Sequence, residues 1–238
     1  MYINFSILFH FFPNQAVLLD RMPPQIGHFI SSNVYDNKLS SNPKHPILNT
    51  TLACQFIDTK GGETKDGTSF KGYTISFLAL QDAAMLLATH LEARNLSYRI
   101  ITGYDAQRSA LEAAMKQNPN VNWKDKCFNV DSFQGNEDDY IIISLVRTWK
   151  PGFLQDLRRT NVMLSRCKRG MIILGNRTFL EGKGKDCLVG KLAQHMMDQV
   201  GEAAWLDRKE LDKDTFEFHR HVDTLPPSPE SADSPNTT

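Results

Sequence analysis

Residues 130–148 read VDSFQGNEDDYIIISLVRT, and residues 157–176 read LRRTNVMLSRCKRGMIILGN. Within the first stretch, the run Tyr140–Val146 is apolar on both faces, as expected for a central strand of a parallel sheet covered by helices on both sides. Comparable apolar and β-branched runs predict five further strands, at Ala16–Leu19, Leu52–Ile57, Tyr98–Thr102, Cys127–Val130 and Met171–Gly175.

Helical patterns lie between these strands. One apolar stripe recurs at helical spacing from Phe77 to Leu91, Asp105 is expected to cap a helix running to about Lys116, and two more helices are expected at 157–164 and 188–197. This alternation predicts a doubly wound α/β fold with a mainly parallel sheet and helices on both faces. Ligands of such folds bind at the carboxyl ends of the strands, so we expect the polar clusters that adjoin the strands to share that edge.

Composition excludes several classes of protein. The chain has 238 residues, of which 41% are hydrophobic and 23% charged, values typical of a globular protein and not of a disordered one. No apolar run approaches the ~20 residues of a membrane-spanning helix, so no membrane partner is predicted. The four cysteines form no CxxC pair, which predicts neither a disulfide framework nor a metal site. Cys167 lies between two basic residues, yet a structural role is favoured over a reactive thiolate.

The charge is unevenly distributed although the total is zero. Residues 147–191 contain eleven basic and three acidic residues, whereas residues 198–238 contain ten acidic and four basic ones. The basic block is typical of a surface that binds a nucleic-acid backbone, and a solvated helix face is the alternative. Residues 198–238 are also rich in Pro and Ser and are expected to be a largely disordered tail. Residues 1–15 are an apolar leader, either a buried strand or an artefact.

Four motifs resemble the last motifs of superfamily 1 helicases, and the branch that includes the nonsense-mediated-decay and senataxin-like proteins is the most similar. Two are the stretches quoted above; the others are YRIITGYDAQ at 98–107 and LLDRMPPQIGHFISSNVYDNKL at 18–39. Their order is that of the family, and the resemblance covers about residues 16–197. It implies the second, C-terminal RecA-like domain of the helicase motor.

The resemblance also implies a shared ATP site. ATP and Mg²⁺ would bind jointly with an N-terminal RecA-like half, and Arg21 and Arg166 would be arginine fingers that reach the γ-phosphate. Glu137 would accept hydrogen bonds from the ribose, placed by a turn at Gln134 and Gly135. The alternatives are solvated or ion-paired arginines and a solvated acidic turn.

A single strand of RNA or DNA is the other implied partner. The polar residues that follow the strands would face its backbone, namely Thr102, Tyr104, Ser132, Arg147 and Thr148. Helix capping by Ser132 and ordinary packing of Tyr104 are the alternatives. The family resemblance allows a cytoplasmic or a nuclear protein.

The sequence departs from the family in ways that bear on function. It contains no GxxxxGK[ST] and no DExx box, lacks the TQY that precedes Arg21 in the family, has KGYTISFLALQ at residues 71–81 where an Asn-x-x-Glu helix start is common, and has Gly103 in place of a proline. We therefore expect a truncated or mis-spliced product that has no ATPase activity alone. Three hypotheses follow: the C-terminal motor domain of a helicase, a non-catalytic nucleic-acid-binding or scaffold remnant, and another P-loop enzyme, which the missing P-loop disfavours.

Overall fold

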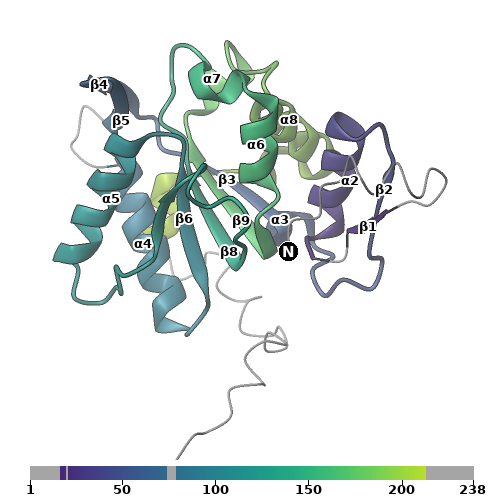
Figure 1. Ribbon diagram of the computed structural model, residues 1–238, viewed down its shortest axis with the longest axis horizontal. Helices are drawn as coiled ribbons and strands as arrows, with labels where there is room; N and C mark the ends of the chain where they lie inside the picture. The colour runs from purple at the N-terminus through teal and green to yellow at the C-terminus, as the bar shows by residue number, and fades with distance from the viewer. Residues whose placement is uncertain (1–16, 20, 74–78, 213–238) are drawn as a thin grey trace, which may run out of the picture.

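A six-stranded sheet forms the centre of the computed structural model, which describes residues 17–19, 21–73 and 79–212 (Figure 1). Every neighbouring pair of strands is parallel. In their order across the sheet, the strands are β10 (Trp205–Asp207), β3 (Cys54–Asp58), β9 (Cys167–Gly175), β8 (Asp138–Ser144), β6 (Tyr98–Thr102) and β7 (Cys127–Asn129). The predicted parallel sheet is therefore confirmed. The predictions for residues 1–15, Ala16 and Phe77 lie outside the described residues.

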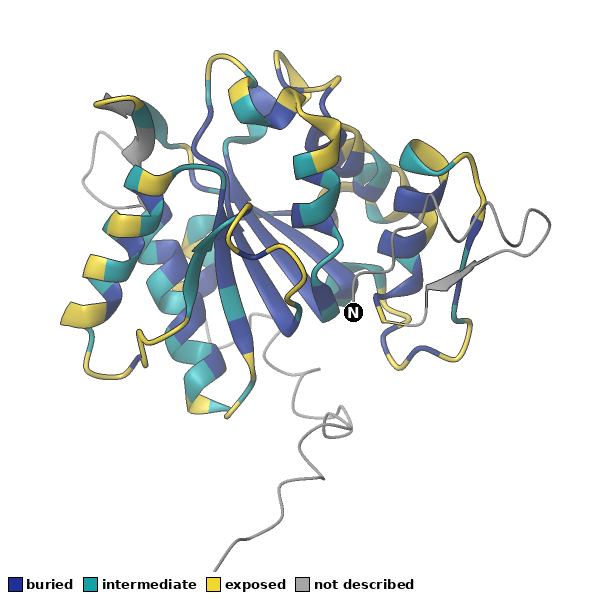
Figure 2. Cartoon of the chain, in the orientation of Figure 1, coloured by how far each residue is buried: buried dark blue, intermediate teal, exposed yellow. Residues whose placement is uncertain are grey.

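Helices cover both faces of the sheet, as predicted. Helices α4 (Ala79–Ala93) and α5 (Asp105–Gln117) pack on one face. Helices α2 (Pro24–Val34), α6 (Leu157–Leu164) and α8 (Leu188–Val200) pack on the other. Because successive side chains of a strand point to opposite faces, β8 divides its side chains between two cores: Ile141 and Ile143 join one, Tyr140 and Ile142 the other. Figure 2 shows the resulting dark-blue buried centre.

Smaller elements surround the sheet. β1 (Val17–Leu19) pairs in parallel with β2 (Leu39–Ser41), and β4 (Gly62–Asp66) and β5 (Ser69–Tyr73) form an antiparallel hairpin. The short helices are α3 (Thr50–Ala53) and α7 (Arg177–Glu181), with single 3₁₀ turns η1 (Gly152–Gln155), η2 (Gly201–Ala204) and η3 (Arg208–Asp212). Leu52, which was expected to begin a strand, lies in α3 instead. No helix in the described part of the chain is long and apolar enough to cross a membrane.

The segment 198–212 is folded, which corrects the expectation that the tail begins at residue 198. β10 extends the sheet by pairing with β3, and Trp205 is buried against Phe56, with 4.9 Å between ring centroids. The side-chain amide of Gln55 donates to the carbonyl oxygens of Ala203 and Ala204, at 3.0 and 2.9 Å. These contacts outweigh the acidic composition of the segment. The remainder of the predicted tail, residues 213–238, lies outside the described residues.

The predicted site residues do not all lie at one edge of the sheet, contrary to expectation. Glu137 immediately precedes β8 and Arg166 immediately precedes β9, so both lie at the amino ends of parallel strands. The backbone N–H of Asp138 donates to the carbonyl of Arg166 at 3.1 Å, which joins the two segments there. The reason is the loop 130–137, which follows β7 at the carboxyl edge and must return to the amino edge to enter β8.

Candidate functional site

Three of the predicted residues meet at the amino edge of the sheet, between β8 and β9. Arg21 forms an ion pair with Glu137, although 116 residues separate them in sequence. Lys168, one residue into β9, places its Nζ 3.6 Å from the other carboxylate oxygen of Glu137. We call Arg21, Glu137, Arg166 and Lys168 the amino-edge cluster.

Arg166 is held in place by three acceptors. Its Nε donates to the Val162 carbonyl at 2.7 Å, one Nη donates to Ser165 Oγ at 2.9 Å, and the other donates to the Asn136 carbonyl at 3.4 Å. Burial lowers the pKa of Arg166, and the positive charge of Arg21 lowers it further. The two guanidinium groups are thus close enough to repel each other, and the negative charge of Glu137 offsets part of this repulsion.

A tight turn positions Glu137. Gly135 has a φ of 88°, a conformation that glycine adopts without the steric cost of a side chain. The N–H of Asn136 donates to the Phe133 carbonyl at 3.1 Å, and the buried Phe133 ring anchors the turn in the core. Gln134, by contrast, is exposed on the outside of the turn. Gly135 is therefore part of the turn that was predicted to place Glu137.

The residues of the amino-edge cluster fit the phosphate and ribose groups of a nucleotide. Three cationic side chains and one carboxylate converge there, and a guanidinium presents a fork of donors that matches phosphate oxygens. Within the described residues, no group of three or more His, Cys, Asp or Glu side chains is arranged to hold a metal ion.

The predicted nucleic-acid residues lie at the carboxyl edge, on the side where α7 and the β4–β5 hairpin are drawn at the top of Figure 1. Tyr104 follows β6, and its hydroxyl accepts from the N–H of Phe153 at 3.3 Å. The two rings meet edge-on with centroids 6.2 Å apart, and the Arg159 guanidinium lies 4.8 Å from the Phe153 centroid. Two half-buried aromatic rings and a cation therefore stand together at this edge.

Arg147 does not face solvent, which corrects its predicted position on the nucleic-acid surface. Its side chain is 9% exposed; Nε donates to the Lys150 carbonyl at 2.9 Å, and Nη2 lies 3.2 Å from Glu63 Oε1. The other oxygen of Glu63 accepts from the N–H of Thr148 at 2.6 Å. Arg147 thus ties the loop after β8 to β4. A carboxylate 84 residues earlier in sequence compensates its charge.

Thr102 is buried as well, at the end of β6, with 1% of its surface exposed. Its hydroxyl oxygen has no hydrogen-bond partner among the described residues. The side chain has no route to solvent in this structure, so the predicted contact with a nucleic-acid backbone is not available to the surface as it stands. The physical reason is that Thr102 is still within the sheet, where both neighbours of β6 enclose it.

Ser132 is exposed at the same edge, in a turn organised by Asn129. The side chain of Asn129 accepts from the Ser132 N–H at 2.8 Å and donates to Asp105 at 2.7 Å. Asp105 was expected to cap α5, but it is the first helical residue; the cap position is Tyr104, which makes no side-chain capping bond. Arg159 Nε donates to Asp131 at 2.9 Å, so α6 is joined to the same turn.

Cys167 has the structural role that the sequence favoured. It is 2% exposed, and burial raises the pKa of its thiol to about 12, more than the positive charge of Arg166 lowers it. The thiol therefore stays protonated at neutral pH and is not a nucleophile.

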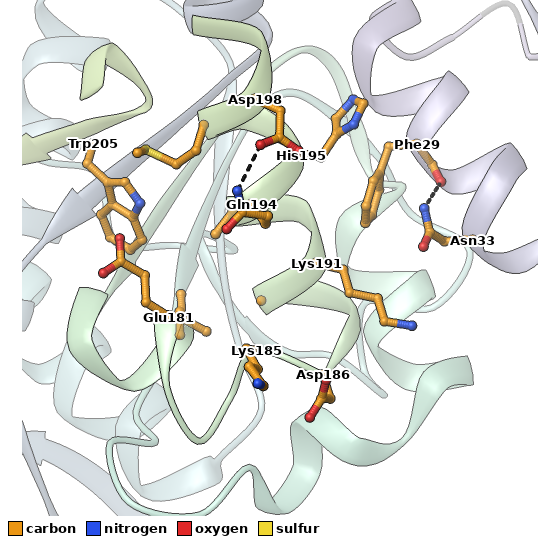
Figure 3. A pocket seen from close by; sticks show the side chains of 14 residues that line it. Phe29, Asn33, Glu181, Lys185, Asp186, Lys191, Gln194, His195, Asp198 and Trp205 are labelled. Carbon is orange, nitrogen blue, oxygen red and sulfur yellow. Dashed lines mark hydrogen bonds between the residues drawn. The ribbon is translucent and has the colours of Figure 1, made fainter. Parts of the chain in front are cut away.

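One pocket is separate from both groups of residues. It has a volume of about 440 Å³ and lies along α8, between α7 and α2. Figure 3 shows Phe29 and Asn33 on one side and Glu181 and Trp205 on the other. The residues that line it include none of the predicted site residues. Of these lining residues, Phe29 and Asn33 belong to the motif at 18–39, but neither was assigned a role from the sequence.

Sequence reasoning missed the residues that support the site from a distance. Lys168 was considered only as a basic neighbour of Cys167 and as part of the basic block, and Glu63 carries no local signal that pairs it with Arg147. Phe153 lies in a glycine-containing loop whose pattern predicts no structure. Only the quoted family motifs could indicate that such loops meet, and they include Lys168 but neither Glu63 nor Phe153.

Comparisons with known proteins give the family. The sequence matches the AAA domain family over residues 7–178. It is 33% identical over 207 residues to the regulator of nonsense transcripts 1 of Dictyostelium discoideum, covering 79% of this chain and 15% of that protein. It is 31% identical to an uncharacterized ATP-dependent helicase of Methanocaldococcus jannaschii, covering 74% of this chain and 29% of that protein.

Among solved structures, the crystal structure of the PRRSV nsp10 helicase matches 69% of this chain and 24% of that chain, at 15% identity and a TM-score of 0.36. The chain spans less than a third of the length of the two curated relatives described above. Its mainly parallel, helix-covered sheet and its family match agree. The chain belongs to the AAA domain family, as a RecA-like α/β domain related to the superfamily 1 helicases that include the regulator of nonsense transcripts 1.

Proposed function

We propose that this chain is the C-terminal half of an ATP-dependent helicase motor that acts on single-stranded RNA or DNA, in the cytoplasm or the nucleus. The amino-edge cluster contacts ATP that a P-loop half holds together with Mg²⁺. The carboxyl edge follows the nucleic-acid backbone. The observation that carries the proposal is the convergence of Arg21, Glu137 and Arg166 from three distant segments at one point.

The geometry supports a different role for each residue of the amino-edge cluster. Arg166 keeps its position through three acceptors that are all part of this chain, so it is preorganised to offer its remaining donors to a phosphate. Arg21 forms an ion pair with Glu137. When ATP binds, the ion pair between Arg21 and Glu137 breaks. Glu137 then accepts hydrogen bonds from the ribose hydroxyls, and Arg21 donates to the γ-phosphate. Lys168 stays close to Glu137, so the carboxylate still has a positive charge nearby after Arg21 has left it.

The two edges are about 20 Å apart, because β8 has seven residues that each rise about 3.3 Å. The loop 130–137 bridges that distance, with Ser132 near one edge and Glu137 at the other. A movement of Glu137 when the nucleotide binds or leaves can therefore be passed along this loop to Ser132, at the edge that follows the nucleic acid. This arrangement is what a motor needs to couple ATP turnover to movement along a strand.

A chimera tests the nucleotide half of the proposal. Residues 16–212 replace the matched segment of the Dictyostelium relative, which brings its own N-terminal part, and ATP hydrolysis is measured with and without single-stranded RNA. We expect turnover that Arg166→Ala reduces about 10³-fold or more, the effect of removing an arginine finger. Arg208→Ala is the matched control, because Arg208 is a surface arginine paired with Asp212.

Two results would overturn this half of the proposal. One is an active chimera whose rate is the same with Arg166→Ala as with Arg208→Ala. The other is ATP turnover by the present chain alone that disappears with Arg166→Ala, because a lone half-site should not hydrolyse ATP. A non-catalytic binding module, the alternative function, predicts strand binding with no turnover in any combination.

Strand binding is tested separately by fluorescence anisotropy with labelled single-stranded oligonucleotides. A backbone-binding surface should lose affinity as salt rises, with a slope of about −0.7 per phosphate contact on a double-logarithmic plot. Comparable affinity for RNA and DNA is expected, because backbone contacts carry little base information. A salt-independent affinity would contradict the proposal.

A further inference from the structure

An exposed tryptophan stands at the carboxyl end of β8 and is not explained by the fold. Trp149 is 62% exposed, although burying so large a ring is normally favourable. Its neighbours along the chain are Thr148 and Lys150, within the loop that follows β8. The same edge carries Tyr104 and Phe153, the aromatic residues described above.

The loop that carries Trp149 is fixed on both sides of the ring. Arg147 Nε donates to the carbonyl of Lys150 at 2.9 Å, which closes the loop around Trp149. The N–H of Thr148 donates to Glu63 at 2.6 Å. Both anchors are mostly buried, with the Arg147 and Glu63 side chains 9% and 15% exposed. The backbone is therefore held still while the indole is presented to solvent, and little conformational entropy would be lost on binding a ligand.

The surroundings of the indole are cationic. The ammonium group of Lys183, from the segment between α7 and α8, lies over the Trp149 ring. Lys150 follows Trp149 in sequence, and residues 147–155 contain no acidic side chain. In the part of the chain that the structure describes, Lys150 and Lys183 form no ion pair, so both charges are available to an anionic partner.

We propose that Trp149 is a stacking platform for one base of a single-stranded nucleic acid, with Lys183 and Lys150 placed for the phosphates that flank this base. Every base offers a π-face, so an exposed ring with a cation beside it suits a strand of any sequence. This inference rests on the proposed strand-binding edge and adds to it a contact with a base. A protein partner would gain less from the two unpaired lysines unless its own surface were acidic.

An abasic strand separates stacking from backbone contacts. Anisotropy titrations of the whole chain use a labelled oligothymidylate and an abasic strand with the same number of phosphates, at about 50 mM salt. We expect Trp149→Leu to weaken binding of the oligothymidylate about 5- to 150-fold, the range for loss of one stacked base. It should leave binding of the abasic strand unchanged. Trp149→Phe keeps a ring and should retain most of the affinity.

Trp123→Leu is the matched control. Trp123 is also exposed, at 38%, and also has a lysine over its ring, with Lys116 Nζ 4.3 Å from the centroid. It precedes β7, at the opposite edge of the sheet, so its replacement should change neither titration. Thermal unfolding of each variant checks that the fold is kept.

The outcomes distinguish the two proposals. If the unsubstituted chain binds both strands and Trp149→Leu changes neither affinity, or both equally, the stacking platform is wrong and the backbone-binding edge stands. If the unsubstituted chain binds neither strand, the proposed function fails and the inference fails with it.

Discussion

The ion pair between Arg147 and Glu63 is largely buried and should be costly to break, and Glu63→Ala tests this. Glu63 lies on β4, and its two oxygens accept from Arg147 and from the backbone of Thr148, at 3.2 and 2.6 Å. Removing the carboxylate leaves a guanidinium that is 9% exposed without its counter-charge. Loss of one partner of a buried pair costs about 3–5 kcal/mol.

The structure narrows that range. Glu63 is 15% exposed, so water can approach the vacated position and solvate part of the Arg147 charge. We therefore expect the lower end, a loss of about 3 kcal/mol in the free energy of unfolding. For a chain of this size that corresponds to a fall of about 6–12 °C in Tm. Glu63→Gln, which keeps an acceptor but loses the charge, should fall between Glu63→Ala and the unsubstituted protein.

Urea unfolding followed by circular dichroism is the assay, with stability obtained by linear extrapolation. Asp36→Ala is the control, because Asp36 pairs with Lys38 on the surface with both side chains more than half exposed. Such a pair contributes about 0–1 kcal/mol. A Glu63→Ala loss no larger than that of Asp36→Ala would refute the reasoning. So would strict additivity with Arg147→Ala in the double variant, because coupled partners must show a non-additive term.

Three further predictions follow from burial and close packing. Burial lowers the pKa of His195 below its ordinary 6.5, so the unfolded chain binds a proton at this side chain more readily than the folded protein does. The free energy of unfolding should therefore fall as the pH decreases through about 6.5. In thermal unfolding measured as a function of pH, His195→Gln should reduce this dependence. Burial raises the pKa of the Cys54 and Cys167 thiols, so an aromatic disulfide reagent should label neither at neutral pH until urea is added; rapid labelling of the native protein would contradict this. A Cβ at Gly103 would lie 2.5 Å from Phe153 Cδ1, so Gly103→Ala should displace this ring and cost about 1–3 kcal/mol in urea unfolding, whereas unchanged stability would mean that the ring moves freely.

Local pattern was enough to predict most of the central sheet. The runs at 98–102, 127–130 and 140–146 became β6, β7 and β8 within two residues at every end, because a buried parallel strand needs continuous apolar side chains wherever it occurs. The helices at 157–164 and 188–197 were also correct, since helical periodicity is a local property. β10 was not predicted, because three residues of an acidic segment carry no such pattern and become a strand only by pairing with β3.

The candidate site was likewise predicted only in part from the sequence. The family motifs were sufficient to single out Arg21, Glu137 and Arg166, and the fold brings these three together; their roles remain proposals. The edge at which they meet was predicted wrongly, because the loop 130–137 must cross the sheet before β8 begins, and the direction of a crossing depends on strand order.

By itself, the sequence determined the fold class and the family, because apolar periodicity and motif residues can both be recognised within short segments of the chain. Only the tertiary structure decided which charges face solvent. Arg147 was predicted to contact nucleic acid, yet the fold buries it beside Glu63, a residue no local pattern connects to it. Trp149, two residues further on, is left exposed by the same contacts. The physical reason is that burial and charge pairing depend on neighbours that are distant along the chain and adjacent only after folding.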